Sequence, residues 1–224
     1  MSLVTPLQFN TVQPNLYRGS YPREINLSFF KTLRLKNILS LTPEPLDDTI
    51  SQFCKDNNIQ MKHVECNTKA PGDKSKKVKR KKKQVPIEYD VVIECIKFIV
   101  DKRNYPIYIH CSNGELISSL VIACVRKFSF WSTVSILNEF LIYNSSINVY
   151  ERNFIENFNA EIEIDGLKIN DKVPWITGRF VTTNEKREQR YSTKKEAESA
   201  KEPTATKVSS NIPSSLPKLK FHSF

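Results

Sequence analysis

The chain has 224 residues, of which 39% are hydrophobic, and its net charge is +10. This length suits one domain, alone or with a tail, and no run of about 18 apolar residues marks a membrane span. The charge is local, because residues 74–83 carry eight positive charges and leave +2 for the rest of the chain. A nucleic-acid-binding surface spread over the fold is therefore not expected.

Strand and helix patterns alternate along the chain. Short apolar or alternating runs between turn residues predict strands, and apolar residues three and four apart predict helices. In chain order the predicted elements are strand 15–19, helix 24–34, strand 37–41, helix 46–57, strand 59–64, helix 86–100, strand 107–110 and helices 118–129, 132–142 and 150–158. This alternation predicts an α/β fold with a central, mostly parallel sheet flanked by helices.

The composition changes toward the C-terminus. Residues 1–160 hold the predicted elements and form one expected domain, and residues 161–180 are expected to be a short appendage packed on it. Residues 181–224 consist largely of Lys, Glu, Ser, Thr and Pro, with almost no large apolar side chain before Leu216. Such a segment cannot bury enough apolar surface to offset its ordering entropy, so we expect a disordered tail.

The most informative stretch is residues 106–119. A β-rich apolar run ends at His110-Cys111, turns through Gly114 and re-enters a helical pattern at Leu120. A loop over a helix start binds anions through its amides and lowers the pKa of a thiol placed there. Cys111 is therefore the candidate nucleophile. The alternative is that Cys111 is simply a small buried residue at a strand end. The candidate phosphate loop contains Ser112, Asn113, Gly114, Glu115, Leu116, Ile117 and Ser118.

Several segments together resemble the plant and fungal atypical dual-specificity phosphatases, and among them the fungal oxidant-induced cell-cycle-arrest group. The resemblance spans residues 4–158, and its carriers are Asn15-Leu-Tyr-Arg-Gly-Ser-Tyr-Pro-Arg, Leu35-Lys-Asn-Ile-Leu-Ser-Leu-Thr-Pro-Glu, Tyr105-Pro-Ile-Tyr-Ile-His-Cys, Ala123-Cys-Val-Arg-Lys and Phe154-Ile-Glu. It implies a cysteine-based phosphatase fold without a cofactor, and activity on phosphotyrosine or inositol pyrophosphates. It also implies assembly with homologous phosphatase-family subunits as a hetero-oligomer.

The loop departs from the pattern of active relatives, which is His-Cys-Asn-Arg-Gly-Lys-His-Arg-Thr-Gly. Their cationic positions are here Asn113, Glu115, Leu116 and Ile117. Guanidinium binds phosphate bidentately, and losing one such stabilising group costs on the order of 10²–10³ in rate. We therefore expect weak or absent activity and a role as a subunit of a phosphatase complex. The alternative is an active phosphatase on phosphotyrosine or inositol pyrophosphates.

The remaining candidates are weaker. Asp73 is a candidate general acid or a turn residue. The basic run 74–83 fits a phosphorylated or polyanionic ligand, a nuclear import signal or a solvated surface insertion. Five scattered cysteines, an odd number, suit a reducing compartment, and we expect the cytoplasm. His63 and His222 lie far apart, so no metal site is expected.

Overall fold

The computed structural model describes residues 3–66, 85–159, 161–163, 167–176 and 180–181. All of them lie in the unit Met1–Thr183. The candidate acid Asp73, the basic run 74–83 and the chain beyond residue 181 lie outside the described residues.

A five-stranded sheet forms the centre of the fold, in the order β1-β2-β5-β3-β4. The edge strand β1 is antiparallel to β2, whereas the other neighbouring strands are parallel. The strands are β1 (Asn10–Gln13), β2 (Leu16–Gly19), β3 (Asn37–Thr42), β4 (Gln60–Glu65) and β5 (Ile107–Cys111). The predicted α/β fold with a mostly parallel sheet is confirmed.

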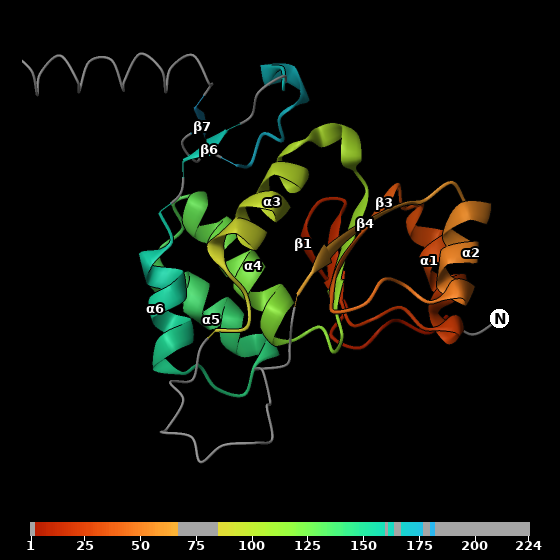
Figure 1. Ribbon diagram of the computed structural model, residues 1–224, viewed down its shortest axis with the longest axis horizontal. Coiled ribbons are helices and arrows are strands. Elements are labelled where there is room, and N and C mark those ends of the chain that lie inside the picture. The colour runs from red at the N-terminus through yellow and green to blue at the C-terminus, as the bar shows by residue number, and fades with distance from the viewer. Residues whose placement is uncertain (1–2, 67–84, 160, 164–166, 177–179, 182–224) are drawn as a thin grey trace, which may run out of the picture. The chain divides into compact units, whose positions relative to one another are not determined.

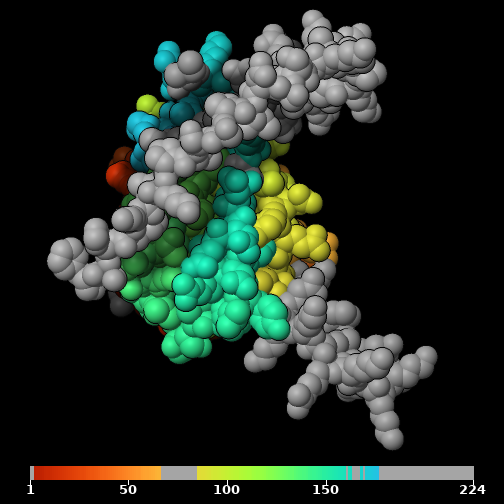
Figure 2. All heavy atoms as spheres, turned by 90° about the vertical axis from the view of Figure 1, so that its left-hand side faces the viewer, coloured from red at the N-terminus to blue at the C-terminus, as the bar shows by residue number. Residues whose placement is uncertain are grey.

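Helices cover both faces of the sheet (Figure 1). One face carries α1 (Leu27–Leu33) and α2 (Asp48–Asp56), and the other carries α3 (Tyr89–Val100), α4 (Leu116–Phe128), α5 (Thr133–Tyr143) and α6 (Val149–Asn157). Figure 2 looks onto the second face, where α6 lies between α3 and the α4–α5 pair. The other described elements are 3-10 turns at Glu24–Asn26, Lys102–Asn104 and Ile169–Asp171 and a small parallel sheet of β6 (Ile162–Glu163) and β7 (Phe180–Val181).

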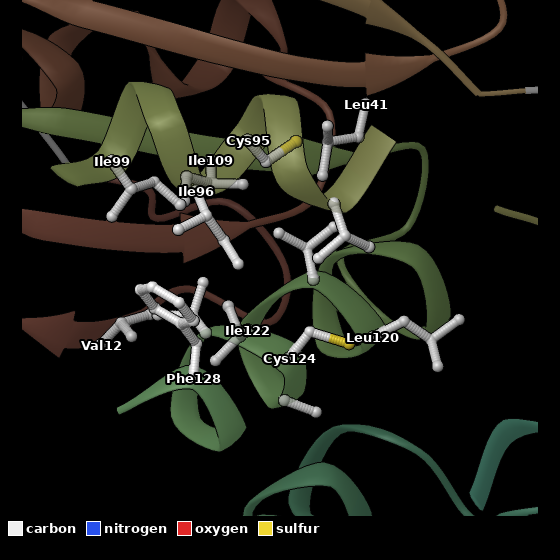
Figure 3. Packing of buried hydrophobic residues seen from close by; sticks show 14 of the residues in the cluster. Val12, Leu41, Cys95, Ile96, Ile99, Ile109, Leu120, Ile122, Cys124 and Phe128 are labelled. Atoms are coloured by element: carbon white, nitrogen blue, oxygen red, sulfur yellow. The ribbon is translucent and has the colours of Figure 1, made fainter. Parts of the chain in front are cut away.

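Strand β5 is buried on both faces, as a central parallel strand must be. Ile107, Ile109 and Cys111 belong to the hydrophobic cluster beneath α3 and α4. Figure 3 shows Ile109 of this strand in one cluster with Ile96 and Leu120. Tyr108, between them, belongs to the cluster under α1 and α2. Each fully buried aliphatic side chain contributes about 1.5–3 kcal/mol, so this strand is anchored from both sides.

Helix α4 follows the candidate loop directly and is buried on almost every side. Eleven of its residues are buried, because α4 packs against β5 and against α3, α5 and α6. A helix that is apolar all round is typical of a protein interior. This burial fixes the direction of the helix, and with it the position of the loop at its N-terminus. No helix in the described part of the chain is both long and apolar enough to cross a membrane.

Side-chain caps begin three of the helices. Asp47 accepts a hydrogen bond from Ile50 N at 2.8 Å at the start of α2, and Ser132 accepts one from Ser135 N at the start of α5. Asn148 and Glu151 form a reciprocal capping box at the start of α6. Such caps typically contribute about 1 kcal/mol each.

Candidate active site

The loop between β5 and α4 holds the predicted nucleophile. Cys111 is the last residue of β5 and only 1% exposed. Gly114 turns the loop with φ +78°, and a Cβ at this position would lie 2.7 Å from the backbone of Gly19 and Ser20. Both the left-handed conformation and the close approach require glycine. The loop therefore rests on the backbone that follows β2.

The segment after β2 also bonds the loop. Residues Gly19 and His110 are in register on β2 and β5, so the chain leaving β2 runs beside the loop. Tyr21 N donates to the Ser112 carbonyl at 3.3 Å, and Arg18 Nη2 donates to the Gly114 carbonyl at 2.8 Å. Two loop carbonyls are thus held by a segment far away in the sequence.

The sulfur of Cys111 has two polar neighbours. Ser118 Oγ, in the first turn of α4, lies 3.5 Å from Cys111 Sγ. The sulfur also lies 3.7 Å from Asn113 Oδ1, to which the thiol donates. Ser118 Oγ donates to the Glu115 carbonyl at 3.2 Å. The structure therefore brings Cys111 Sγ and Ser118 Oγ within hydrogen-bonding distance of each other.

Asn113 and Glu115 bond each other across the loop. Asn113 Oδ1 accepts the Glu115 amide N–H at 3.1 Å, and Asn113 Nδ2 donates to Glu115 Oε2 at 2.7 Å. One of the amides that this kind of loop offers to an anion is thereby occupied by the protein's own side chain. The carboxylate of Glu115 adds a negative charge to the loop that follows Cys111.

Position 117 contributes no charge. The Ile117 side chain is 3% exposed and packs in the hydrophobic cluster of α3 and α4. Leu116 is half-buried against the same cluster. Ser112 and Asn113 are exposed at the loop surface. The loop thus presents polar and anionic groups outward, and its arginine position has become part of the core.

The fold and loop agree with comparisons to known proteins. Residues 3–177 match a family model described as "Tyrosine phosphatase family". The chain belongs to the tyrosine phosphatase family. It is 64% identical over 229 residues, covering 100% of both chains, to "Putative tyrosine-protein phosphatase OCA6" of Saccharomyces cerevisiae. The resemblance to the fungal group predicted from the sequence is thereby confirmed.

Two other similar proteins are named an inositol diphosphatase and a PP-IP phosphatase. The chain is 34% identical over 161 residues to "Inositol diphosphatase DSP3" of Arabidopsis thaliana, covering 70% of this chain and 72% of that one. It also matches the core catalytic domain of the PP-IP phosphatase SIW14 from S. cerevisiae, solved with citrate. That match has a TM-score of 0.61 at 28% identity and covers 70% of this chain and 89% of the other.

His110 lies behind the loop of this phosphatase domain and is fully buried. Its Nε2 lies 2.8 Å from Ser40 Oγ on β3, and its ring meets Tyr21 edge-on with centroids 5.4 Å apart. Burial lowers the pKa of His110 from 6.5 to about 3. The ring is therefore neutral at pH 7 and adds no positive charge to the site.

Sequence reasoning left Arg18 without a role, although the structure places it against the loop. It is 1% exposed and contacts both the loop and the first turn of α4. The only local signal was a charged residue inside the otherwise apolar strand β2. In the described part of the chain, no group of three or more His, Cys, Asp or Glu side chains could hold a metal ion.

Proposed function

We propose that this tyrosine phosphatase family member keeps its cysteine nucleophile but hydrolyses phosphotyrosine and inositol pyrophosphates weakly or not at all. The observation that carries the proposal is Ile117, packed in the core at 3% exposure where a loop arginine would bind the phosphoryl oxygens. Arginine fixes those oxygens bidentately and stabilises the charge of the transition state. An isoleucine supplies neither.

The rest of the loop adds to this loss. Glu115 is half-buried and anionic, so it repels a phosphate group. Asn113 already occupies the Glu115 amide. Losing one transition-state donor costs on the order of 10²–10³ in rate, and a contributing arginine can be worth about 10³–10⁵. The expected rate of the native chain is therefore lower than that of an arginine-bearing loop by at least two orders of magnitude.

The test is turnover by the purified chain on an aryl phosphate and on an inositol pyrophosphate. Cys111→Ser is assayed beside it, because this substitution removes the nucleophile and leaves the loop backbone. Cysteine-dependent turnover on either substrate is expected to be absent or at least about 10² below the rates typical of enzymes. Hydrolysis by the native chain at rates typical of enzymes (on the order of 1–10³ s⁻¹) that disappears in Cys111→Ser would refute the proposal.

An active inositol diphosphatase is the second candidate, and the similarity to DSP3 and SIW14 favours it. The two candidates differ in the result of the same assay, because an inositol diphosphatase would turn over the pyrophosphate but leave the aryl phosphate largely intact. For this second candidate, we propose that the basic run 74–83 binds the polyanionic substrate. Replacing its lysines by serine and measuring inositol pyrophosphate binding by calorimetry would test that site.

We further propose that the chain acts as a non-catalytic subunit together with homologous phosphatase-family chains. What supports this role is the number of large apolar side chains exposed on and around α5 and α6. Phe130, Val134, Ile142 and Val149 are 74%, 70%, 71% and 69% exposed. Exposed apolar surface, where it is contiguous, often marks a protein interface.

Co-purification of tagged chain with a homologous subunit tests this role. Val134→Lys with Ile142→Glu is expected to release the partner, since both charges would have to be buried at the interface. Ile25→Lys, at another exposed apolar residue (63%), is the matched control and should leave the complex intact. Retention of the partner by the double variant would exclude α5 from the interface.

We also propose that the protein is located in the cytoplasm. All five cysteines are free thiols, which suits the reducing cytoplasm. Nuclear import through 74–83 would be seen as a nuclear signal from a fluorescent fusion that disappears when the run is replaced by serine.

A further inference from the structure

A buried cation lies on the inner side of the loop. Arg18, on β2, is among the largest fully buried side chains, at 1% exposure. Its Nη2 lies 2.8 Å from the Gly114 carbonyl, 2.7 Å from Ser119 Oγ and 3.2 Å from Ser118 Oγ. Its guanidinium carbon also lies 3.5 Å from the centre of the Tyr143 ring on α5.

Burying the Arg18 guanidinium costs free energy, and the packing of its side chain alone does not explain why a charge lies here. Burial lowers the pKa of Arg18 to about 10, so the group is still protonated at pH 7. Its hydrogen bonds go to a carbonyl and two hydroxyls, and the nearby carboxylate of Glu139 is itself paired with Arg126 at 2.8 Å. A buried cation without a paired carboxylate is expensive, whereas an apolar side chain would fill the same space at lower cost. A buried charge of this kind is a candidate functional group.

We propose that Arg18 is the fixed positive charge of this site and that it activates the Cys111 sulfur through Ser118. Arg18 Nη2 has two protons and three acceptors, so it shares one proton between a nearer acceptor and Ser118 Oγ at 3.2 Å, and Ser118 Oγ lies 3.5 Å from Cys111 Sγ. Because the oxygen of Ser118 accepts the hydrogen bond from Arg18, its own proton remains available for donation. When Cys111 is a thiol, that proton goes to the Glu115 carbonyl. When Cys111 is a thiolate, it turns to the sulfur.

Arg18 is a positioning residue in this scheme, because it acts on the sulfur through another side chain. A hydrogen bond that includes a charged group is roughly twice as strong as a neutral one, so the guanidinium polarises Ser118 toward the thiolate. Its Nη2 is engaged by the Gly114 carbonyl and by two serine hydroxyls on the inner side of the loop, so Arg18 does not replace the missing phosphate clamp. The inference shares with the proposed function the role of Cys111 as nucleophile, and it adds that the sulfur stays activated although the phosphate clamp is lost.

Other titratable groups surround the sulfur and Arg18. Cys66, which follows β4, interacts electrostatically with Cys111, and so does Tyr108 on β5. His110 directly precedes Cys111 in β5, Glu115 lies in the loop, and Tyr143 and Glu139 face Arg18 from α5. Of these groups, Arg18 alone is a cation at neutral pH. The activation of the sulfur is therefore assigned to Arg18.

The test is the rate at which iodoacetamide alkylates Cys111 in the full chain, followed over a range of pH by mass spectrometry of the Cys111 peptide. Arg18→Gln is expected to slow alkylation at neutral pH about tenfold, with the difference shrinking at alkaline pH, where every thiol ionises. Arg18→Lys, which keeps the charge but not the planar fork, should recover part of the rate. Cys111→Ser supplies the blank.

Two further variants keep the test decisive. Ser118→Ala removes only the connecting hydroxyl, and it should slow alkylation in the same way even if Arg18→Gln fails to fold. Arg152→Gln is the charge-loss control, because Arg152 lies on α6, is exposed and pairs with Glu156 at 2.8 Å. It should leave the pH profile of Cys111 unchanged.

An unchanged pH profile in folded Arg18→Gln and Ser118→Ala would overturn the inference, and so would a Cys111 that never reacts. A merely structural role of Arg18 would lower the melting temperature without moving the profile. Alkylation requires no phosphate ester. Turnover by the native chain would therefore refute the proposed function and leave this inference standing. An unchanged alkylation profile would refute this inference and leave the proposed function standing.

Discussion

Ile117→Arg is the substitution that tests the electrostatic account of this loop most directly. Position 117 lies in the first turn of α4, one residue before Ser118. An arginine here can extend from the helix start toward the loop, where it would meet the phosphoryl oxygens. We expect the variant to gain cysteine-dependent hydrolysis of an aryl phosphate, by on the order of 10²–10³ over the native chain.

The gain in rate comes with a loss of stability. Removing the Ile117 side chain from the core forfeits about 1.5–3 kcal/mol of burial, and part of the arginine stem recovers some of it. The free energy of unfolding should therefore fall by about 1–3 kcal/mol, within the usual range for a single substitution. Adding Glu115→Lys removes the repelling carboxylate and should raise the rate further.

The assay compares initial rates at one pH, with Cys111→Ser in each background to remove cysteine-dependent turnover. Ile117→Lys is the matched control, because it carries the charge without the bidentate fork and should gain less. Circular dichroism verifies that each variant is folded. If folded Ile117→Arg neither hydrolyses the ester nor binds vanadate, the missing cation is not what limits this loop.

Three further results are expected. Asn113→Ala frees the Glu115 amide, so sulfate should bind more tightly, measured by calorimetry; equal affinity would show that the amide does not face the anion. Gly114→Ala places a Cβ 2.7 Å from the backbone of Gly19 and should lower the melting temperature, because the left-handed φ adds strain to the clash. His110 cannot protonate in the folded chain until about pH 3, whereas the unfolded chain protonates near 6.5. Unfolding free energy should therefore fall as pH drops through this range, by up to about 1.4 kcal/mol per pH unit, and His110→Asn should flatten the slope in urea titrations.

The sheet and helices could be predicted because their patterns are long and locally consistent. The buried strand 37–41 and the helix 46–57 appear as β3 and α2 with small changes at their ends. Strand β1 was missed, because only Val12 of its four residues is buried and an edge strand that short has no clear alternation. Helix α4 begins at Leu116, two residues earlier than predicted, since the loop is tighter than its sequence indicates.

In the candidate site, features that are contiguous in the sequence could be predicted, whereas contacts between distant residues could not. The strand, loop and helix around Cys111 are contiguous, so their sequence predicts a cysteine on an anion-binding loop. The bond between Asn113 and Glu115 is also local. It could have been predicted, because asparagine side chains often accept a hydrogen bond from the backbone amide two residues later. The contact of Arg18 with Gly114 joins residues 96 apart in the chain, and only the pairing of β2 with β5 brings them together.

The contact of Gly114 with the backbone of Gly19 and Ser20 has a practical consequence for anyone shortening this domain. The first twenty residues look dispensable, since they precede the buried strand β3 and contain only short elements. Yet Arg18, Gly19 and Ser20 lie directly against the loop that follows Cys111. A fragment that starts at β3 would keep every residue of the loop and still lose its shape, so recombinant versions should be trimmed only from the other end.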